Sequence, residues 1–505
     1  MPDRTPLGSG AGKVPSLIRN WISLAGIILA ASSFFAVACL IGLDFYAGFS
    51  NPYTGILTYI IAPVFLSMGL LLILVGVLRE RHRRRGLAPG EIPAHLRIDF
   101  NVPHQRNAFI IVVVVTFVFL MFTALGSYRT YEFTESVQFC GETCHGVMKP
   151  EYTAYQNSPH ARVACVQCHV GPGATWYLKS KLAGSYQVYA TIFDKYPRPI
   201  PAPLNELRPA QQTCEQCHWP EKFFGSVEKV NQHFAADETN TPWTIRMLVK
   251  VGGGDPSQGP VGGIHWHMSI ANKVEYIATD EARQQIPWVR FTDHNGKVTV
   301  YQSSDNPIPP AKLSAMTPRR MDCIDCHNRP SHIYNDPDHA VDQALSTGRM
   351  DASLSFVKKH AIEALTGDYK DTGEALTRIS ASLTKDYATS TNRVAVVQAI
   401  AEVQNIYTNN FFPEMKVSWR AYPSNIGHLI FPGCYRCHDG KHVSDTGQPI
   451  THNCDACHTI ISQGRGGQVA SISPQGLEFK HPTDIEGMWK DMNCSDCHNG
   501  GLVGQ

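Results

Sequence analysis

Six times in this chain, two cysteines separated by two residues are followed directly by a histidine. Thiols at this spacing lie on one turn, where each can add to a vinyl group of the same porphyrin, and the next imidazole then lies over the iron. The pattern is the attachment signature of a c-type haem. The six motifs are Cys165-Val-Gln-Cys168-His169, Cys214-Glu-Gln-Cys217-His218, Cys323-Ile-Asp-Cys326-His327, Cys434-Tyr-Arg-Cys437-His438, Cys454-Asp-Ala-Cys457-His458 and Cys494-Ser-Asp-Cys497-His498.

A seventh site, the first in chain order, has three residues between its thiols: Cys140-Gly-Glu-Thr-Cys144-His145. We interpret it as a haem site as well, so the sequence predicts seven haem c groups. Met148 follows three residues after His145, and a thioether can serve as an axial iron ligand that raises the reduction potential. Met148 is therefore a candidate ligand beside His145. The alternative is a methionine that packs against the porphyrin.

Zinc and disulfide bonds are the competing explanations for paired cysteines. A zinc ribbon combines two CxxC pairs on one ion and does not need a histidine after each pair. Disulfides do not need a neighbouring histidine either. At the Cys and His frequencies of this chain, chance produces about 0.02 CxxCH pentapeptides, so six are not accidental. The one cysteine outside the seven sites, Cys39, lies in an apolar run and is interpreted as a small packing residue.

Each low-spin haem needs a second axial ligand, and the 22 histidines of the chain offer candidates beyond those in the motifs. His265 and His267, two apart in a glycine-punctuated stretch, would face the same side of a strand. One of them could ligate iron while the other bonds a propionate. Five further histidines stand near haem motifs and are the preferred distal ligands: His160, His332, His428, His442 and His481.

Three long apolar runs without charged residues occupy the first quarter of the chain: Trp21 to Leu43, Ile56 to Leu78 and Ala108 to Leu125. Each has roughly 20 residues, enough for a helix to cross the hydrocarbon of a bilayer. The first run is too long for the apolar stretch of a cleaved signal peptide. We expect three transmembrane helices.

Basic residues predict the orientation of these helices. They precede the first run and cluster at 79–85 after the second, whereas the loop 44–55 has neither Lys nor Arg. The positive-inside rule places the N-terminus in the cytoplasm and everything after Leu125 outside, which is the periplasm for a bacterial inner-membrane protein. Haem c is attached on that side. Membrane topology and anionic lipid explain the arginine cluster, so we expect membrane lipid and no nucleic acid as a partner.

The predicted fold class is a membrane-anchored multihaem cytochrome c: three N-terminal transmembrane helices and a mostly α/irregular, haem-packed periplasmic domain with a small β insertion. Glycine-punctuated short strands and helical periodicity suggest the boundaries. The expected parts are a membrane domain at 1–130, a module with haem motifs 1–3 at 131–218, an insertion with short strands at 219–322, and a four-haem region at 323–505 with a helical spacer at about 351–410.

The segment Phe139 to His169 resembles the NapC/NirT family of membrane-anchored quinol dehydrogenases, through the stretch Met148-Lys-Pro-Glu-Tyr-Thr-Ala-Tyr-Gln-Asn-Ser-Pro-His160 and the second haem motif. The architecture of the whole chain is similar to seven-haem inner-membrane cytochromes of metal-reducing bacteria, which pass menaquinol electrons toward extracellular acceptors. The resemblance implies a quinol pocket beside the first haem, with Met148 as the methionine ligand and Lys181 near the quinol-site lysine.

The chain departs from the family pattern in two places. The family usually has CxxCHxM, and here both the thiol spacing and the methionine offset are one residue longer. The acidic residue expected after the lysine is not evident, since Gln187 and Val188 occupy that region. The alternative role for Lys181 is a contact with a lipid phosphate.

The resemblance implies a quinol:cytochrome c oxidoreductase that oxidises menaquinol at the outer face of the inner membrane and transfers electrons to periplasmic c-type cytochromes. Two other classes stay open. The chain could be an electron-relay subunit of a larger respiratory complex, in an oligomer or with a partner membrane subunit, or a terminal reductase that acts at an open haem. An iron with a free coordination position would favour the reductase, and a co-purifying partner with its own quinone site would favour the relay subunit.

Overall fold

The computed structural model describes most of the chain in two compact units, residues 1–134 with 170–184 and residues 135–169 with 185–505. The described residues are 17–47, 62–85, 100–143, 145–171, 173–204, 207–257, 259–269, 271–466 and 472–502.

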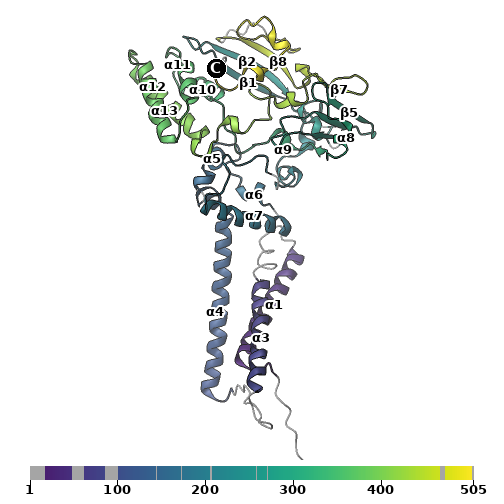
Figure 1. Cartoon of the computed structure of the whole chain (residues 1–505), viewed down its shortest axis with the longest axis vertical. Coiled ribbons are helices and arrows are strands. Elements are labelled where there is room, and N and C mark those ends of the chain that lie inside the picture. Colours follow the sequence, from purple (N-terminus) through teal and green to yellow (C-terminus); the bar gives the residue numbers. More distant parts are fainter. Residues whose placement is uncertain are drawn as a thin grey trace, which may run out of the picture. The chain divides into compact units, whose positions relative to one another are not determined.

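Three long helices make up most of the first unit: α1 (Trp21–Ala47), α3 (Ala62–Arg84) and α4 (Pro103–Thr134). Helices α1 and α3 lie side by side (Figure 1) and approach closely at glycines. A Cβ atom on Gly26 would lie 2.7 Å from the carbonyl oxygen of Gly69. The contact therefore depends on small residues, as is common where two apolar helices pack backbone to backbone.

The three predicted transmembrane helices coincide in part with these elements. Residues 56–61 of the second predicted span lie outside the described residues. Within the described part of the chain, no helix is both long enough and apolar enough to traverse a bilayer. The structure thus does not confirm the three spans.

Short helical turns carry the haem motifs of the second unit. The first site is followed by the longer helix α5 (His145–Gln156), and helix α7 (Ala174–Ile192) follows the second motif. Asp322 and Asn493 begin two of the turns as N-caps, each in a capping box with the aspartate of its own motif. The motif turns are a π turn at Phe139–Thr143, α6 (Cys165–His169), 3-10 turns at Cys214–Gln216, Gly433–Arg436 and Cys454–Ala456, α9 (Cys323–Cys326) and α14 (Cys494–Cys497).

Two antiparallel sheets form the β part of this unit, in the orders β1-β2-β8 and β6-β3-β4-β5-β7. The expected insertion at 219–322 supplies β1 to β6, and the C-terminal region adds one edge strand to each sheet. The insertion and the four-haem region therefore fold together. The strands are β1 (Ser226–Phe234), β2 (Pro242–Lys250), β3 (Lys273–Ile277), β4 (Trp288–Thr292), β5 (Val298–Ser303), β6 (Arg319–Arg320), β7 (His442–Ser444) and β8 (His458–Arg465).

The expected helical spacer is a bundle that begins one helix earlier than predicted. It comprises α10 (Pro337–Ser346), α11 (Val357–Leu365), α12 (Thr372–Asp386) and α13 (Arg393–Asn410), which lie together in Figure 1. Their apolar faces form the largest core cluster of the described residues. Further apolar clusters lie in the five-stranded sheet and between α5 and the segment 412–422. The remaining short elements are 3-10 turns at Ala210–Gln212, Pro220–Lys222, Ile264–Met268, Pro413–Met415, Trp419–Ala421 and Met488–Lys490, and α8 (Pro310–Leu313).

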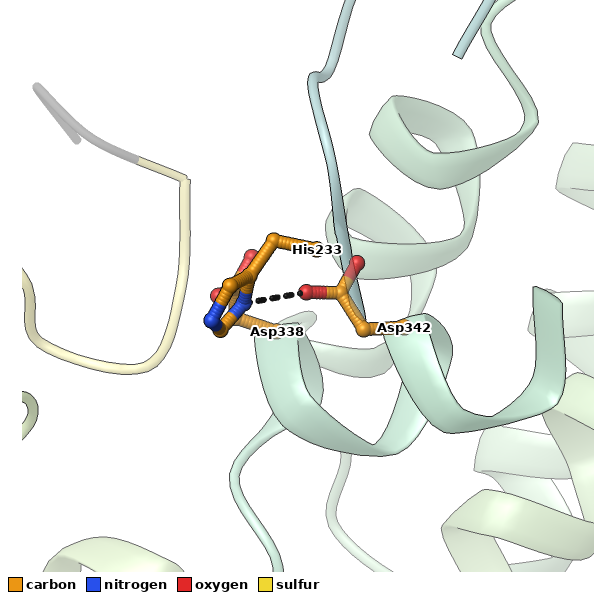
Figure 2. A group of neighbouring side chains, drawn as sticks. All are labelled: His233, Asp338 and Asp342. Atoms are coloured by element: carbon orange, nitrogen blue, oxygen red, sulfur yellow. Dashed lines mark hydrogen bonds and ion pairs between the residues drawn. The ribbon is translucent and has the colours of Figure 1, made fainter. Parts of the chain in front are cut away.

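A buried ion cluster ties β1 to the helical bundle. The Lys358 ammonium, in a side chain only 5% exposed, donates to carboxylate oxygens of Asp338 and Asp342, each 2.7 Å away. His233 Nδ1 lies 3.1 Å from the other oxygen of Asp342 (Figure 2). The histidine and the two aspartates could hold a metal ion by residue type. Here Lys358 supplies the positive charge instead.

The charge state of Lys358 follows from its surroundings. Burial alone would lower the pKa of its ammonium, but the two carboxylates outweigh burial, and the pKa is raised. Lys358 is therefore a permanent cation between two anions.

We expect Lys358→Ala to reduce the free energy of unfolding by about 3–5 kcal/mol, because it leaves the buried carboxylate of Asp342 and the partly buried carboxylate of Asp338 without their counter-charge. Lys359→Ala, at the exposed next position, is the matched control and should change stability by no more than about 0.5 kcal/mol. Urea unfolding followed by circular dichroism measures both variants. Equal midpoints for the two would show that the cluster does not stabilise the fold.

Candidate haem-binding sites

Six of the seven motif histidines lie opposite a second histidine. Two imidazoles bound on opposite sides of one metal, through nitrogens about 2 Å from it, have ring centroids roughly 6 Å apart. Each gap therefore has the width that one ligated iron requires. The pairs and their centroid distances are His169–His332 at 6.3 Å, His218–His160 at 6.1 Å, His327–His265 at 6.3 Å, His438–His267 at 5.8 Å, His458–His428 at 6.2 Å and His498–His481 at 6.1 Å.

Hydrogen bonds at Nδ1 orient several of the distal rings. Nδ1 of His332 lies 3.0 Å from the Glu151 carbonyl oxygen, and Nδ1 of His481 lies 2.7 Å from that of Thr483. A ring that donates its Nδ1 proton to a carbonyl keeps its Nε2 lone pair for a metal, which is the usual arrangement around metal-bound histidine. Nε2 of such a ring is then the unprotonated nitrogen.

Burial favours the neutral form of two of the distal imidazoles. It lowers the pKa of His332 and of His428 to about 4. A metal ligand must be the neutral ring, so this environment suits iron ligation. The thirteen motif cysteines that the structure describes are all free thiols, as covalent attachment of haem requires.

The first two motifs lie side by side. The Cys140 thiol hydrogen-bonds that of Cys165, which lowers the pKa of Cys165 to about 7. The second motif in turn adjoins the third: burial and the nearby Cys214 thiol raise the pKa of Cys168.

Direct hydrogen bonds join the third, fourth and fifth motifs. The Ala210 amide, just before the third motif, donates to the carboxylate of Asp322, 3.1 Å away, which caps the fourth. The Arg436 guanidinium of the fifth motif donates to the Asp325 carbonyl oxygen of the fourth, 2.8 Å away. These bonds fix the distances between neighbouring attachment turns.

The last three motifs continue the series. The Tyr435 ring of the fifth motif stacks on His428, the partner of the sixth, with 4.3 Å between centroids. Burial and the Cys454 thiol of the sixth motif raise the pKa of Cys494 in the seventh. In the described residues, each motif is therefore next to its neighbours in sequence.

The structure contradicts the prediction of His442 as a distal ligand. Its Nδ1 lies 2.8 Å from the Asp439 carboxylate and its Nε2 2.6 Å from the Ile286 carbonyl oxygen. Neither nitrogen is free for iron, and the buried ring instead fixes the start of β7. His442 was predicted because it is only four residues from His438. A second ligand, however, has to come from a segment on the opposite side of the haem, and so short a stretch of chain does not reach it.

The expectation for His265 and His267 also needs correction. They lie on the 3-10 turn Ile264–Met268 rather than on a strand, and each faces a different motif histidine. Both histidines therefore stand as candidate iron ligands.

Only part of the predicted quinol site lies within the described residues. Cys144 lies outside them, as do the side chains of His145 and Lys181. Met148 is half-buried on α5. The structure places His145 and Met148 on α5 and Lys181 on α7, without assigning a ligand pair to the first site.

Sequence comparisons with known proteins identify the family of this chain. Residues 102–200 match the N-terminal region of the NapC/NirT cytochrome c family. The chain is 45% identical over 495 residues to the cytochrome c-type protein ImcH of Geobacter sulfurreducens, and this match covers 96% of each chain. The chain belongs to the NapC/NirT cytochrome c family. Members of this family are membrane-anchored cytochromes that carry covalently bound haem c and take part in electron transport. No solved structure matches the chain.

We expect His428→Ala to convert one haem from low spin to high spin, because it removes the ring opposite His458. His442→Ala is the matched control, a buried histidine of the same region that should leave every haem ligated as before. Electron paramagnetic resonance of the oxidised protein counts the low-spin irons, and added imidazole should restore the lost one. A high-spin iron in His442→Ala, or none in His428→Ala, would contradict these assignments.

Proposed function

We propose that this protein oxidises menaquinol at the outer face of the bacterial inner membrane and passes the electrons through seven haem c groups to periplasmic c-type cytochromes. The six histidine pairs carry the proposal. An iron held between two imidazoles has no open position for a substrate, so those six sites suit electron transfer alone. Bound haem c supplies one-electron chemistry at each site.

The pairs also argue against a terminal reductase, which needs an open iron. Of the seven motifs, only the first lacks a described partner ring, because its histidine side chain is outside the described residues. Substrate chemistry in this proposal is assigned to the first site, where the family resemblance implies a quinol pocket. Oxidation of the quinol releases two electrons, taken up singly, and two protons to the periplasm.

Met148 and Lys181 are the residues proposed to act at this site. Both lie within the segment that matches the family, residues 102–200. In the proposal, Met148 lies at the first haem as ligand or packing residue, and the ammonium of Lys181 binds a quinol oxygen. The Cys140–Cys165 contact supports direct passage from the first site to the second.

The proposed membrane anchor consists of α1, α3 and α4, with the N-terminus cytoplasmic and the haem region periplasmic. Large apolar side chains on these helices are well exposed, among them Phe35 at 71% and Phe117 at 67%. Exposed apolar surface of this kind suits contact with lipid.

The test is anaerobic mixing of purified, detergent-solubilised protein with a reduced menaquinol analogue, with haem reduction followed in the visible α-band. We expect reduction of all haems that dithionite reduces. Lys181→Ala should slow the initial phase about tenfold, equivalent to about 1.4 kcal/mol of lost quinol binding or activation. Lys179→Ala is the matched control on the same helix, where the ammonium lies over Trp176.

Two results would count against the proposal. Failure of the quinol to reduce any haem would refute quinol oxidation by this chain, and reduction only with an added membrane partner would favour the relay subunit. Equal rates for Lys181→Ala and the unaltered protein would remove Lys181 from the quinol site.

A further inference from the structure

The turn Ile264–Met268 faces two haem motifs at once. His265 lies 6.3 Å from His327 with the rings nearly parallel, at 10°, and His267 lies 5.8 Å from His438 with the rings nearly perpendicular, at 88°. Only Trp266 separates the two histidines. Motifs that are distant in sequence therefore meet at one five-residue turn.

Hydrogen bonds fix both histidines to the backbone. The amide of His265 donates to the Gly252 carbonyl oxygen at 3.0 Å, and its Nδ1 lies 2.8 Å from that of Val251. Nδ1 of His267 lies 2.9 Å from the Ile264 carbonyl oxygen. Nε2 of each ring is thus left for a metal, and neither ring can turn without breaking a bond.

Aromatic packing anchors the turn to the five-stranded sheet. The Trp266 ring lies 4.8 Å from that of Phe291 on β4, between centroids. The Phe223 ring lies 4.4 Å from His265 on the other side. The turn is thus held by Phe223 and by the five-stranded sheet.

The glycines of the insertion allow this close seating. A Cβ atom on Gly252 would lie 2.6 Å from the carbonyl carbon of Val261. One on Gly253 would overlap the backbone of His265, and Gly253 also has φ +151°, which L side chains rarely adopt. Gly262, in contrast, has nothing within 4 Å of the position of a Cβ. Only part of the glycine-rich stretch is thus required by packing.

The proximal sides of the two sites are joined as well. Besides its bond to Asp325, Arg436 donates to the Arg283 carbonyl oxygen at 2.7 Å, and Arg283 forms an ion pair with the Asp325 carboxylate at 3.0 Å. The attachment turns of the fourth and fifth motifs are therefore held together independently of the distal turn.

We infer that the turn Ile264–Met268 is a single clamp that supplies the distal ligands of two haems, so that the fourth and fifth sites form one positional unit. The role of the β insertion is then to carry this clamp rather than to bind a separate substrate. The inference rests on the ligation proposed above and extends it, because it makes the ligation of two irons depend on one backbone contact.

Gly253→Ala tests the clamp. We expect it to displace the turn and to convert two haems from low spin to high spin, leaving the others unchanged in the electron paramagnetic resonance spectrum of the oxidised protein. Gly262→Ala, the matched control, should leave all low-spin signals intact. His265→Ala and His267→Ala should each produce one high-spin haem, which added imidazole restores.

If Gly253→Ala converts no haem or only one haem to high spin, the inference is overturned. Should that variant fail to accumulate, Trp266→Ala removes the packing on Phe291 without changing a ligand. It should perturb the signals of the same two haems together, and a change in one alone would also overturn the clamp. If the unaltered protein lacks low-spin signals for its paired sites, the ligation proposal itself fails, and the two failures are distinguishable.

Discussion

Pairs of imidazoles at the width of one ligated iron are the constraint around which the haem region is organised. A side-chain core exists in the helical bundle and in the sheets, but the segments that carry the motifs have little regular structure between their short turns. The positions of these segments depend on which distal histidine lies opposite which motif histidine. Carbonyl oxygens at Nδ1 then orient several of the distal rings, and capping boxes fix two of the motif turns.

Much of the chemistry could be predicted from sequence because it is local. Two thiols and an imidazole within five residues define an attachment site whatever surrounds them. Six of the seven predicted distal histidines do lie opposite a motif histidine. Which motif each one serves could not be predicted, because His332 reaches back to His169 while His160 reaches forward to His218. Such pairings depend on the path of the whole chain.

The predictions for His442 and for the stretch with His265 and His267 differ from the structure for the same reason. His442 stands close to the fifth motif in sequence, but a ligand must lie across the haem, and its ring is used to fix a strand. The alternation of His265 and His267 suggested a strand, yet the glycines before them allow a 3-10 turn against the backbone of 250–253. In both cases, local pattern was overruled by tertiary packing that only a structure provides.

The pairing of His169 with His332 has a consequence for how the protein is made. In the proposed ligation, a haem at the second motif would obtain its partner ring from beyond the fourth motif, so its coordination could not be completed until that later segment had folded. A haem attached earlier would then lack its sixth ligand during maturation. The order in which haems are attached would differ from the order in which their irons become fully ligated.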